Sequence, residues 1–293
     1  MRDYVIFTDS TTDITAAMAD ELQLQLVNLT WTMGDSTYTN YLDGREMSSK
    51  EFYNKLRNGE MATTAQVNPD TFENHFRPHL QAGKDILFLC FSSAISKTYE
   101  SSLIAQKELQ EEFQDAKIYC VDTLCASMGT GLLVWNAVQL KKEGKNIDEV
   151  RDWAENNKLN LIHWFTVDDL KHLHRGGRVS ATQAFAGSLL NIKPVLTVNS
   201  EGRLIPITKA RGRKKSLDVL VEKMAETVTE PTEQMVFISH GDCLDDAEYV
   251  AAQIKERWNV KGVEINTIGP VIGAHSGAGT VALFFFGKER QNS

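Results

Sequence analysis

The chain has 293 residues, more than one hydrophobic core usually holds, so its length predicts two domains. Hydrophobic residues make up 42% of the chain and charged residues 24%, and the net charge of −8 argues against a general nucleic-acid-binding protein. No apolar run approaches the roughly 20 residues that span a bilayer, and the first nine residues lack the apolar core of a signal peptide. We therefore expect a cytoplasmic protein without integral membrane association.

Strand-like and helical patterns alternate through the first half of the chain. The predicted strands are the short apolar runs Tyr4–Thr8, Leu24–Trp31, Ile86–Phe91 and Lys117–Val121. Helical spacing or a helix cap predicts helices over Ser48–Leu56, from Asn68 toward Leu80, from about Thr98, and from Cys125 to Lys142. This alternation favours a parallel sheet with helices on both faces, whose ligands bind at the carboxyl ends of the strands.

The pattern changes beyond about residue 160. The runs Val195–Val198 and Leu204–Thr208 flank a turn-rich stretch and predict a hairpin. Further strands are predicted at Met235–Ser239, Val263–Ile268 and Val281–Phe286, and further helices at Leu217–Val228 and Asp245–Trp258.

The two patterns predict an α/β fold with two domains. We place their boundary in the polar stretch at Asn157, so that residues 1–157 form a three-layer α/β/α domain with a parallel sheet. Residues 158–293 then form an α+β domain with a mixed or antiparallel sheet. The ligand site is expected between the domains, a common place for pockets.

Side chains from three polar segments could together bind one carboxylate. Thr64 precedes the helix at Asn68, Ser96 follows a buried strand at the start of a helix, and His275 stands in a predicted loop of small residues ahead of the last strand. Two hydroxyls and an imidazole can donate hydrogen bonds to one acid group, and a helix N-terminus adds unpaired N–H groups. The apolar run Val281–Phe286 fits either the wall of a cavity or plain core.

The same residues leave other functions open. In a serine hydrolase or acyltransferase, Ser96 would be the nucleophile and His275 the base, with Asp9 or Asp122 orienting the imidazole. The sequence around Ser96, A-I-S-K-T, lacks the G-x-S-x-G elbow, which argues against this function. A third alternative is an interaction module without a ligand, which predicts a filled seam between the domains.

The cysteines indicate no metal or redox chemistry. Positions 90, 120, 125 and 243 lack the spacing of a redox pair, and no Cys/His cluster has metal-ligand spacing. We expect free thiols, no metal and no cofactor.

Four motifs, in order along the chain, resemble the DegV family. They are Thr8-Asp9-Ser10-Thr11-Thr12-Asp13, the Ser92–Ser102 loop, the segment from Phe165-Thr166-Val167-Asp168-Asp169-Leu170 to Gly176-Gly177-Arg178-Val179-Ser180, and Ile268-Gly269-Pro270-Val271-Ile272-Gly273-Ala274-His275. The family comprises bacterial fatty-acid carriers, including FakB-type subunits of fatty acid kinase. The resemblance spans essentially the whole chain.

The resemblance implies a carrier with no catalysis of its own. It implies that an acyl chain such as that of palmitate lies between the domains, with its carboxylate bound by Thr64, Ser96 and His275. A partner kinase would phosphorylate the bound acid, and Arg178 and, more weakly, Arg213 would dock that kinase. Secondary ligand contacts are expected at Asp9, Ser10, Ser93, Ala94, Thr98 and Gly273.

The chain departs from the family pattern at three places, one of which is His275-Ser276-Gly277-Ala278-Gly279 where H-T-G-P-G is usual. Ala65 and Val67 replace a serine and a proline after Thr64, and Lys97 follows Ser96 where glycine is usual. The three proposed carboxylate donors are retained, so these departures bear on headgroup preference more than on lipid binding.

Overall fold

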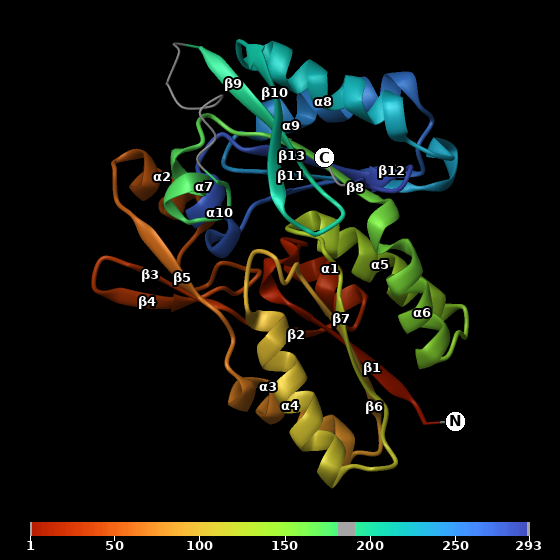
Figure 1. Ribbon diagram of the computed structural model, residues 1–293. Helices are drawn as coiled ribbons and strands as arrows, with labels where there is room; N and C mark the ends of the chain where they lie inside the picture. The colour runs from red at the N-terminus through yellow and green to blue at the C-terminus, as the bar shows by residue number, and fades with distance from the viewer. Residues whose placement is uncertain (1, 181–190, 292–293) are drawn as a thin grey trace.

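A computed structural model describes residues 2–180 and 191–291 of the chain. Figure 1 shows two halves stacked on each other, each built around its own large sheet. In the described residues the N-terminal half holds a four-stranded sheet and the C-terminal half a six-stranded one. No helix in the described part of the chain is long and apolar enough to cross a membrane.

The four-stranded sheet is parallel, as predicted, with the order β2-β1-β6-β7. Its strands are β1 (Tyr4–Asp9), β2 (Gln25–Val27), β6 (Asp85–Cys90) and β7 (Ile118–Asp122). Side chains alternate along β1: Tyr4 and Ile6 face one apolar cluster, and Val5 and Phe7 face another. Burial on both faces explains why these strands are continuous apolar runs.

Helices cover both faces of this sheet. One face packs against α3 (Pro69–Gln81) and α4 (Thr98–Glu112). The other packs against α5 (Met128–Lys142) and α6 (Ile147–Asn157), with α1 (Ala16–Glu21) beside them. The predicted cap at Asn68 is present, because its side chain accepts a hydrogen bond from the Thr71 amide. The α/β/α arrangement of this half is confirmed.

A third, small sheet was not expected from the sequence. The stretch Leu24–Trp31, predicted as one strand, is divided between β2 and β3 (Thr30–Met33). The strand β3 joins β4 (Ser36–Thr39) and β5 (Ala62–Ala65) in an antiparallel sheet with the order β4-β3-β5. This small sheet carries Thr64 and lies beside α2 (Ser49–Arg57) (Figure 1).

The six-stranded sheet is mixed and has the order β10-β9-β8-β13-β11-β12. The predicted hairpin is present: β9 pairs antiparallel with β10. The strands are β8 (Leu161–Thr166), β9 (Ile192–Val198), β10 (Leu204–Arg211), β11 (Met235–His240), β12 (Gly262–Thr267) and β13 (Val281–Phe286).

Two long helices, α8 (Arg213–Thr227) and α9 (Leu244–Arg257), pack on one face of this sheet. The opposite face of β8 and β13 turns toward the N-terminal half, where Phe165, Ala282 and Phe284 join the cluster around α5. The two short helices α7 (Lys171–Arg175) and α10 (Pro270–Ser276) lie side by side next to β5. The boundary at Asn157, where α6 ends, stays a prediction.

Candidate functional site

A cavity of about 430 Å³ lies between the two halves. This volume is within the range of small-molecule sites. The N-terminal half contributes β5 and the loop after β6, and the C-terminal half contributes β8, β13 and α10. The space expected between the domains is therefore present, and the seam is not filled by side chains.

Thr64 and His275 meet at this cavity. Thr64 Oγ1 and His275 Nε2 lie 2.8 Å apart, within hydrogen-bonding distance, and both residues line the cavity. The sequence pattern was interpreted as a loop around His275, but the structure places this residue in the last turn of α10. That prediction was wrong because Pro270 stands at the first turn of a helix, where its missing N–H costs nothing.

Ser96 lines the same cavity from the loop that joins β6 to α4. Its Oγ accepts a hydrogen bond from the Thr98 amide at 3.2 Å and lies 3.0 Å from Thr98 Oγ1. Lys97, the residue that replaces glycine, lines the cavity and is exposed. Thr64, Ser96 and His275, which come from three segments far apart in the sequence, thus line one cavity. We call them the polar triad.

The surroundings of His275 keep its imidazole neutral. Burial, together with the positive charges of Arg178 and Arg175 and the neighbouring His172, lowers the pKa of His275 to about 4. His275 Nδ1 is buried and has no hydrogen-bond partner in the described residues. It faces Gly176, where any side chain would collide with the imidazole. Close packing therefore fixes the position of the ring.

Apolar side chains from both sheets form much of the remaining wall. On β13, Ala282 and Phe284 line the cavity while Phe285 packs into the opposite cluster. On β8, Phe165 and His163 line it. His163 Nε2 accepts a hydrogen bond from the Ala126 amide at 3.2 Å, and burial keeps its pKa well below the usual value. His163 is a wall residue that the sequence interpretation missed, although its two-residue spacing from Phe165 was a usable signal.

The secondary ligand contacts predicted from the sequence divide into two groups. Ser93 and Ala94 line the cavity. The other four residues are not among those that line the cavity, and their contacts are with neighbouring residues of the fold. Asp9 accepts hydrogen bonds from the amides of Thr11 and Phe91, and the Ser10 hydroxyl accepts them from the Leu29 amide and the Asn40 side chain. The Thr98 hydroxyl is hydrogen-bonded to Ser96 and the Val67 amide. Gly273 packs against Tyr53.

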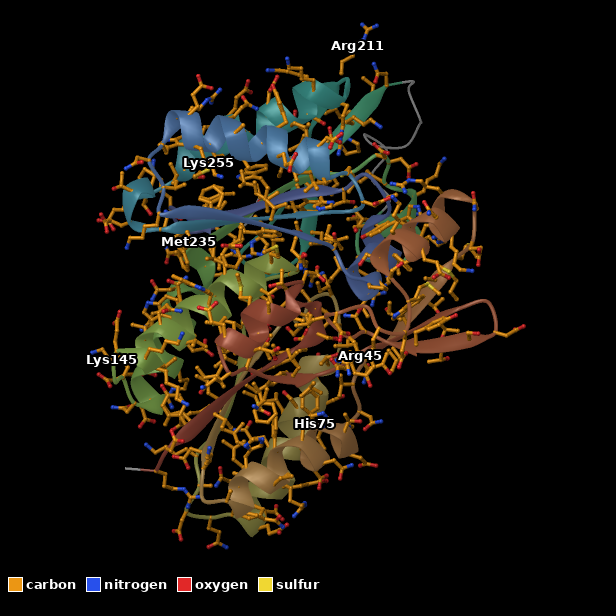
Figure 2. The ribbon with its side chains drawn as sticks, turned by 180° about the vertical axis from the view of Figure 1, so that it is seen from behind. Arg45, His75, Lys145, Arg211, Met235 and Lys255 are labelled. Carbon is orange, nitrogen blue, oxygen red and sulfur yellow. The ribbon has the colours of Figure 1, made fainter. Side chains whose placement is uncertain are left out.

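The two arginines predicted to dock a partner have different surroundings. Arg178 is half-buried and lines the cavity, and its Nε donates to the Ile95 carbonyl at 3.0 Å. Arg213, at the start of α8, pairs with Asp246 at 2.8 Å. Figure 2 shows Arg211, two positions before Arg213, at the outer end of the C-terminal half. The docking roles stay predictions.

The structure supports no Ser96–His275 catalytic pair. Within residues 2–180 and 191–291, no hydrogen bond joins these side chains, because Ser96 is bonded to Thr98 and His275 to Thr64. Asp9 is engaged with Thr11 and Phe91, and Asp122 Oδ1 accepts from the backbone amides of Ser93 and Leu124. Neither acid orients His275.

Comparison with known proteins identifies the family of this chain. The family model described as "Uncharacterised protein, DegV family" matches residues 3–288. A DegV domain-containing protein of Clostridium perfringens is 48% identical over 291 residues, covering 99% of this chain and all of the relative.

Two solved structures are similar along their whole length. A fatty-acid-binding DegV family protein from Thermus thermophilus has a TM-score of 0.89 and 29% identity, covering 98% of this chain and all of that one. A DegV lipid-binding protein from Thermotoga maritima has a TM-score of 0.86 and 28% identity, covering 99% of this chain and all of that one.

Proposed function

Because this chain belongs to the DegV family, we propose that its cavity binds one long-chain fatty acid, such as palmitate, with the carboxylate at the polar triad. The observation that carries the proposal is the hydrogen bond between Thr64 and His275 at a largely apolar cavity that Ser96 also lines. The Thermus thermophilus and Thermotoga maritima proteins, described as fatty-acid-binding and lipid-binding, support it.

The energetics fit such a ligand. Each methylene group removed from water contributes roughly 0.8 kcal/mol, so the acyl chain supplies most of the affinity. The polar triad then sets the orientation of the acid. Since His275 is neutral at pH 7, it contributes a hydrogen bond and not a charge.

The protein acts as a carrier and not as an enzyme in this proposal. It would present the bound acid to a partner fatty acid kinase, as FakB-type carriers do, in the cytoplasm. The surfaces that carry Arg178 and Arg213 are the docking sites in this proposal.

Native mass spectrometry followed by lipid extraction tests the binding step. The purified full chain is expected to carry one fatty acid, which organic extraction releases. Protein that carries no acyl ligand in repeated preparations, and that binds no added palmitate after delipidation, would overturn the proposal.

A separate experiment tests the presentation step. Palmitate-loaded protein is mixed with ATP and the catalytic subunit of a fatty acid kinase, and acyl phosphate is expected only when both proteins are present. The same yield of acyl phosphate from kinase and free palmitate alone would refute presentation while leaving lipid binding intact.

A further inference from the structure

Arg290 is a buried arginine whose guanidinium binds backbone carbonyls. Its exposed fraction is 6%, and it donates to the carbonyls of Leu124 at 2.9 Å, Asn199 at 3.1 Å and Lys158 at 2.9 Å. No ion pair joins it to a carboxylate in the described residues, and burial lowers its pKa. Because a buried charge is costly unless hydrogen bonds compensate it, these carbonyls are expected to stay in place around the guanidinium.

The three carbonyls come from different parts of the fold. Leu124 lies in the loop between β7 and α5 of the N-terminal half, and Lys158 begins η2 (Lys158–Asn160), the short turn that joins the halves. Asn199 begins the turn of the β9–β10 hairpin, whose tip reaches down to the N-terminal half in Figure 1. One side chain therefore joins both halves of the molecule.

A second hydrogen bond joins the hairpin turn to the N-terminal half. Ser92 Oγ, in the loop after β6, donates to the carbonyl of Gly202 in this turn at 2.9 Å. A Cβ at Gly202 would collide with Ser92 Oγ and press against Leu124. The hairpin turn thus packs directly on the N-terminal half. We call the contacts of Arg290 and Ser92 with this turn the clasp.

The segments that the clasp joins form part of the cavity wall. Val198 and Leu204, on either side of the hairpin turn, line the cavity. Ala126 and Ser127, in the loop after β7, line it as well. Arg290 is not among the lining residues, so it acts on a ligand only through the position of this wall.

The loop after β7 has a strained backbone. Leu124 and Ser127 have φ values of +52° and +51°, a region that residues with a side chain rarely adopt. Backbone of this kind persists only where its surroundings hold it. The hydrogen bond from Arg290 to the Leu124 carbonyl is one such contact. Without it we expect the loop to relax away from the hairpin and the wall to open between them.

We propose that Arg290 is a positioning residue: by holding the β9–β10 hairpin against the loop after β7, it slows the release of a bound acyl chain. This rests on the proposed function and adds which contact limits the exchange of its ligand. An acyl chain enclosed between two halves leaves only when part of the seam opens, and the clasp crosses that seam.

Ligand exchange tests the proposal. The full chain is loaded with deuterium-labelled palmitate and mixed with a large excess of unlabelled palmitate, and native mass spectrometry follows the loss of the label. Arg290→Gln is expected to release palmitate about tenfold faster or more, as for lost hydrogen bonds to a charged group. Ser92→Ala removes one neutral hydrogen bond of the clasp and is expected to release palmitate about fivefold faster.

Two control variants separate the clasp from stability. Leu220→Ala removes a buried side chain from the cluster under α8 and α9, so it should lower stability and keep the exchange rate. Arg203→Gln, at an exposed position of the same hairpin, removes an ion pair with Glu201 and is expected to change neither quantity. Thermal unfolding measures the stability of each variant.

Each remaining outcome bears on the proposal or on the proposed function. An exchange rate in Arg290→Gln equal to that of the unchanged protein would overturn the proposal, and so would equally fast exchange in Leu220→Ala. If Arg290→Gln does not fold, Ser92→Ala carries the test, and unchanged release from that variant overturns the proposal. Unchanged protein that takes up no palmitate would instead overturn the proposed function.

Discussion

Thr64 Oγ1 and His275 Nε2 lie 2.8 Å apart although 211 positions separate them in the chain. Thr64 belongs to β5 of the small sheet, and His275 to the last turn of α10. The hydrogen bond thus joins the two halves of the molecule at the cavity. It also holds the imidazole in one orientation before any ligand binds.

Replacing Thr64 with valine should weaken fatty-acid binding. Valine keeps the shape and the strand preference of threonine but removes the partner of His275 Nε2 and one donor to the carboxylate. We expect palmitate affinity to fall by about 1–2 kcal/mol, the range of a lost hydrogen bond. Thr63→Val is the matched control, because the neighbouring Thr63 is exposed and does not line the cavity. Equal palmitate titrations for the two variants would contradict the role of Thr64.

Alanine substitutions at two adjacent glycines should have different effects on the protein. A methyl group at Gly176 would collide with the His275 imidazole, whereas one at Gly177 would meet open space. Gly177 has a φ of +72°, however, so alanine there strains the backbone. We expect Gly176→Ala to lose palmitate. Gly177 also lines the cavity, but a methyl group there displaces no side chain, so Gly177→Ala should lose about 1 kcal/mol of stability and keep its ligand. Thermal unfolding and native mass spectrometry measure the two effects. Normal palmitate content in Gly176→Ala would contradict this packing argument.

Substitutions at two adjacent phenylalanines should distinguish an effect on the shape of the cavity from an effect on the stability of the core. Phe284 lines the cavity, whereas Phe285 packs under α8 and α9. Truncating either to alanine should cost about 3–5 kcal/mol of stability, as for other buried aromatic residues. Only Phe284→Ala enlarges the cavity, so only this variant should shift the extracted fatty acids toward longer or bulkier chains. Gas chromatography of extracted lipids provides the comparison, and the same shift in both variants would count against the assignment of this wall.

Asp13 should make stability depend on pH. Its carboxyl accepts hydrogen bonds from Ser127 Oγ at 2.5 Å and the Gly269 amide at 2.9 Å, with no cation beside it in the described residues. Burial raises its pKa from 3.8 to about 8. Between those values the folded state binds more protons than the unfolded state, so this contribution to stability falls as pH rises from about 4 to about 8.

Urea unfolding from pH 5 to pH 8 measures this effect. The free energy of unfolding of the unchanged protein, relative to Asp13→Asn, should fall by at most about 1.4 kcal/mol per pH unit. Asp20→Asn, at an exposed position, is the control and should run parallel to the unchanged protein. A constant difference between Asp13→Asn and the unchanged protein would contradict the buried, protonated state.

Local patterns predicted most of the regular structure. The continuous apolar runs at Ile86–Phe91 and Val281–Phe286 are buried strands, and the cap at Asn68 begins a helix as expected. Such signals succeed because propensity, capping and periodicity act within a few residues. The prediction of one strand over Leu24–Trp31 was wrong because its mixture of apolar and polar residues suits an extended chain throughout and does not mark the point where the chain leaves one sheet and enters another.

The sequence by itself determined most of the strand and helix order and the family resemblance, and it singled out the three residues of the polar triad as candidates. Only the tertiary structure decided that His275 bonds to Thr64 and not to Ser96, that His163 is part of the cavity wall, and that Arg178 turns into the cavity without an acidic partner. The reason is physical: these relationships depend on how two sheets and two short helices pack across a seam. Packing between segments that lie 83 or 211 positions apart has no period or spacing along the chain that a sequence pattern can show.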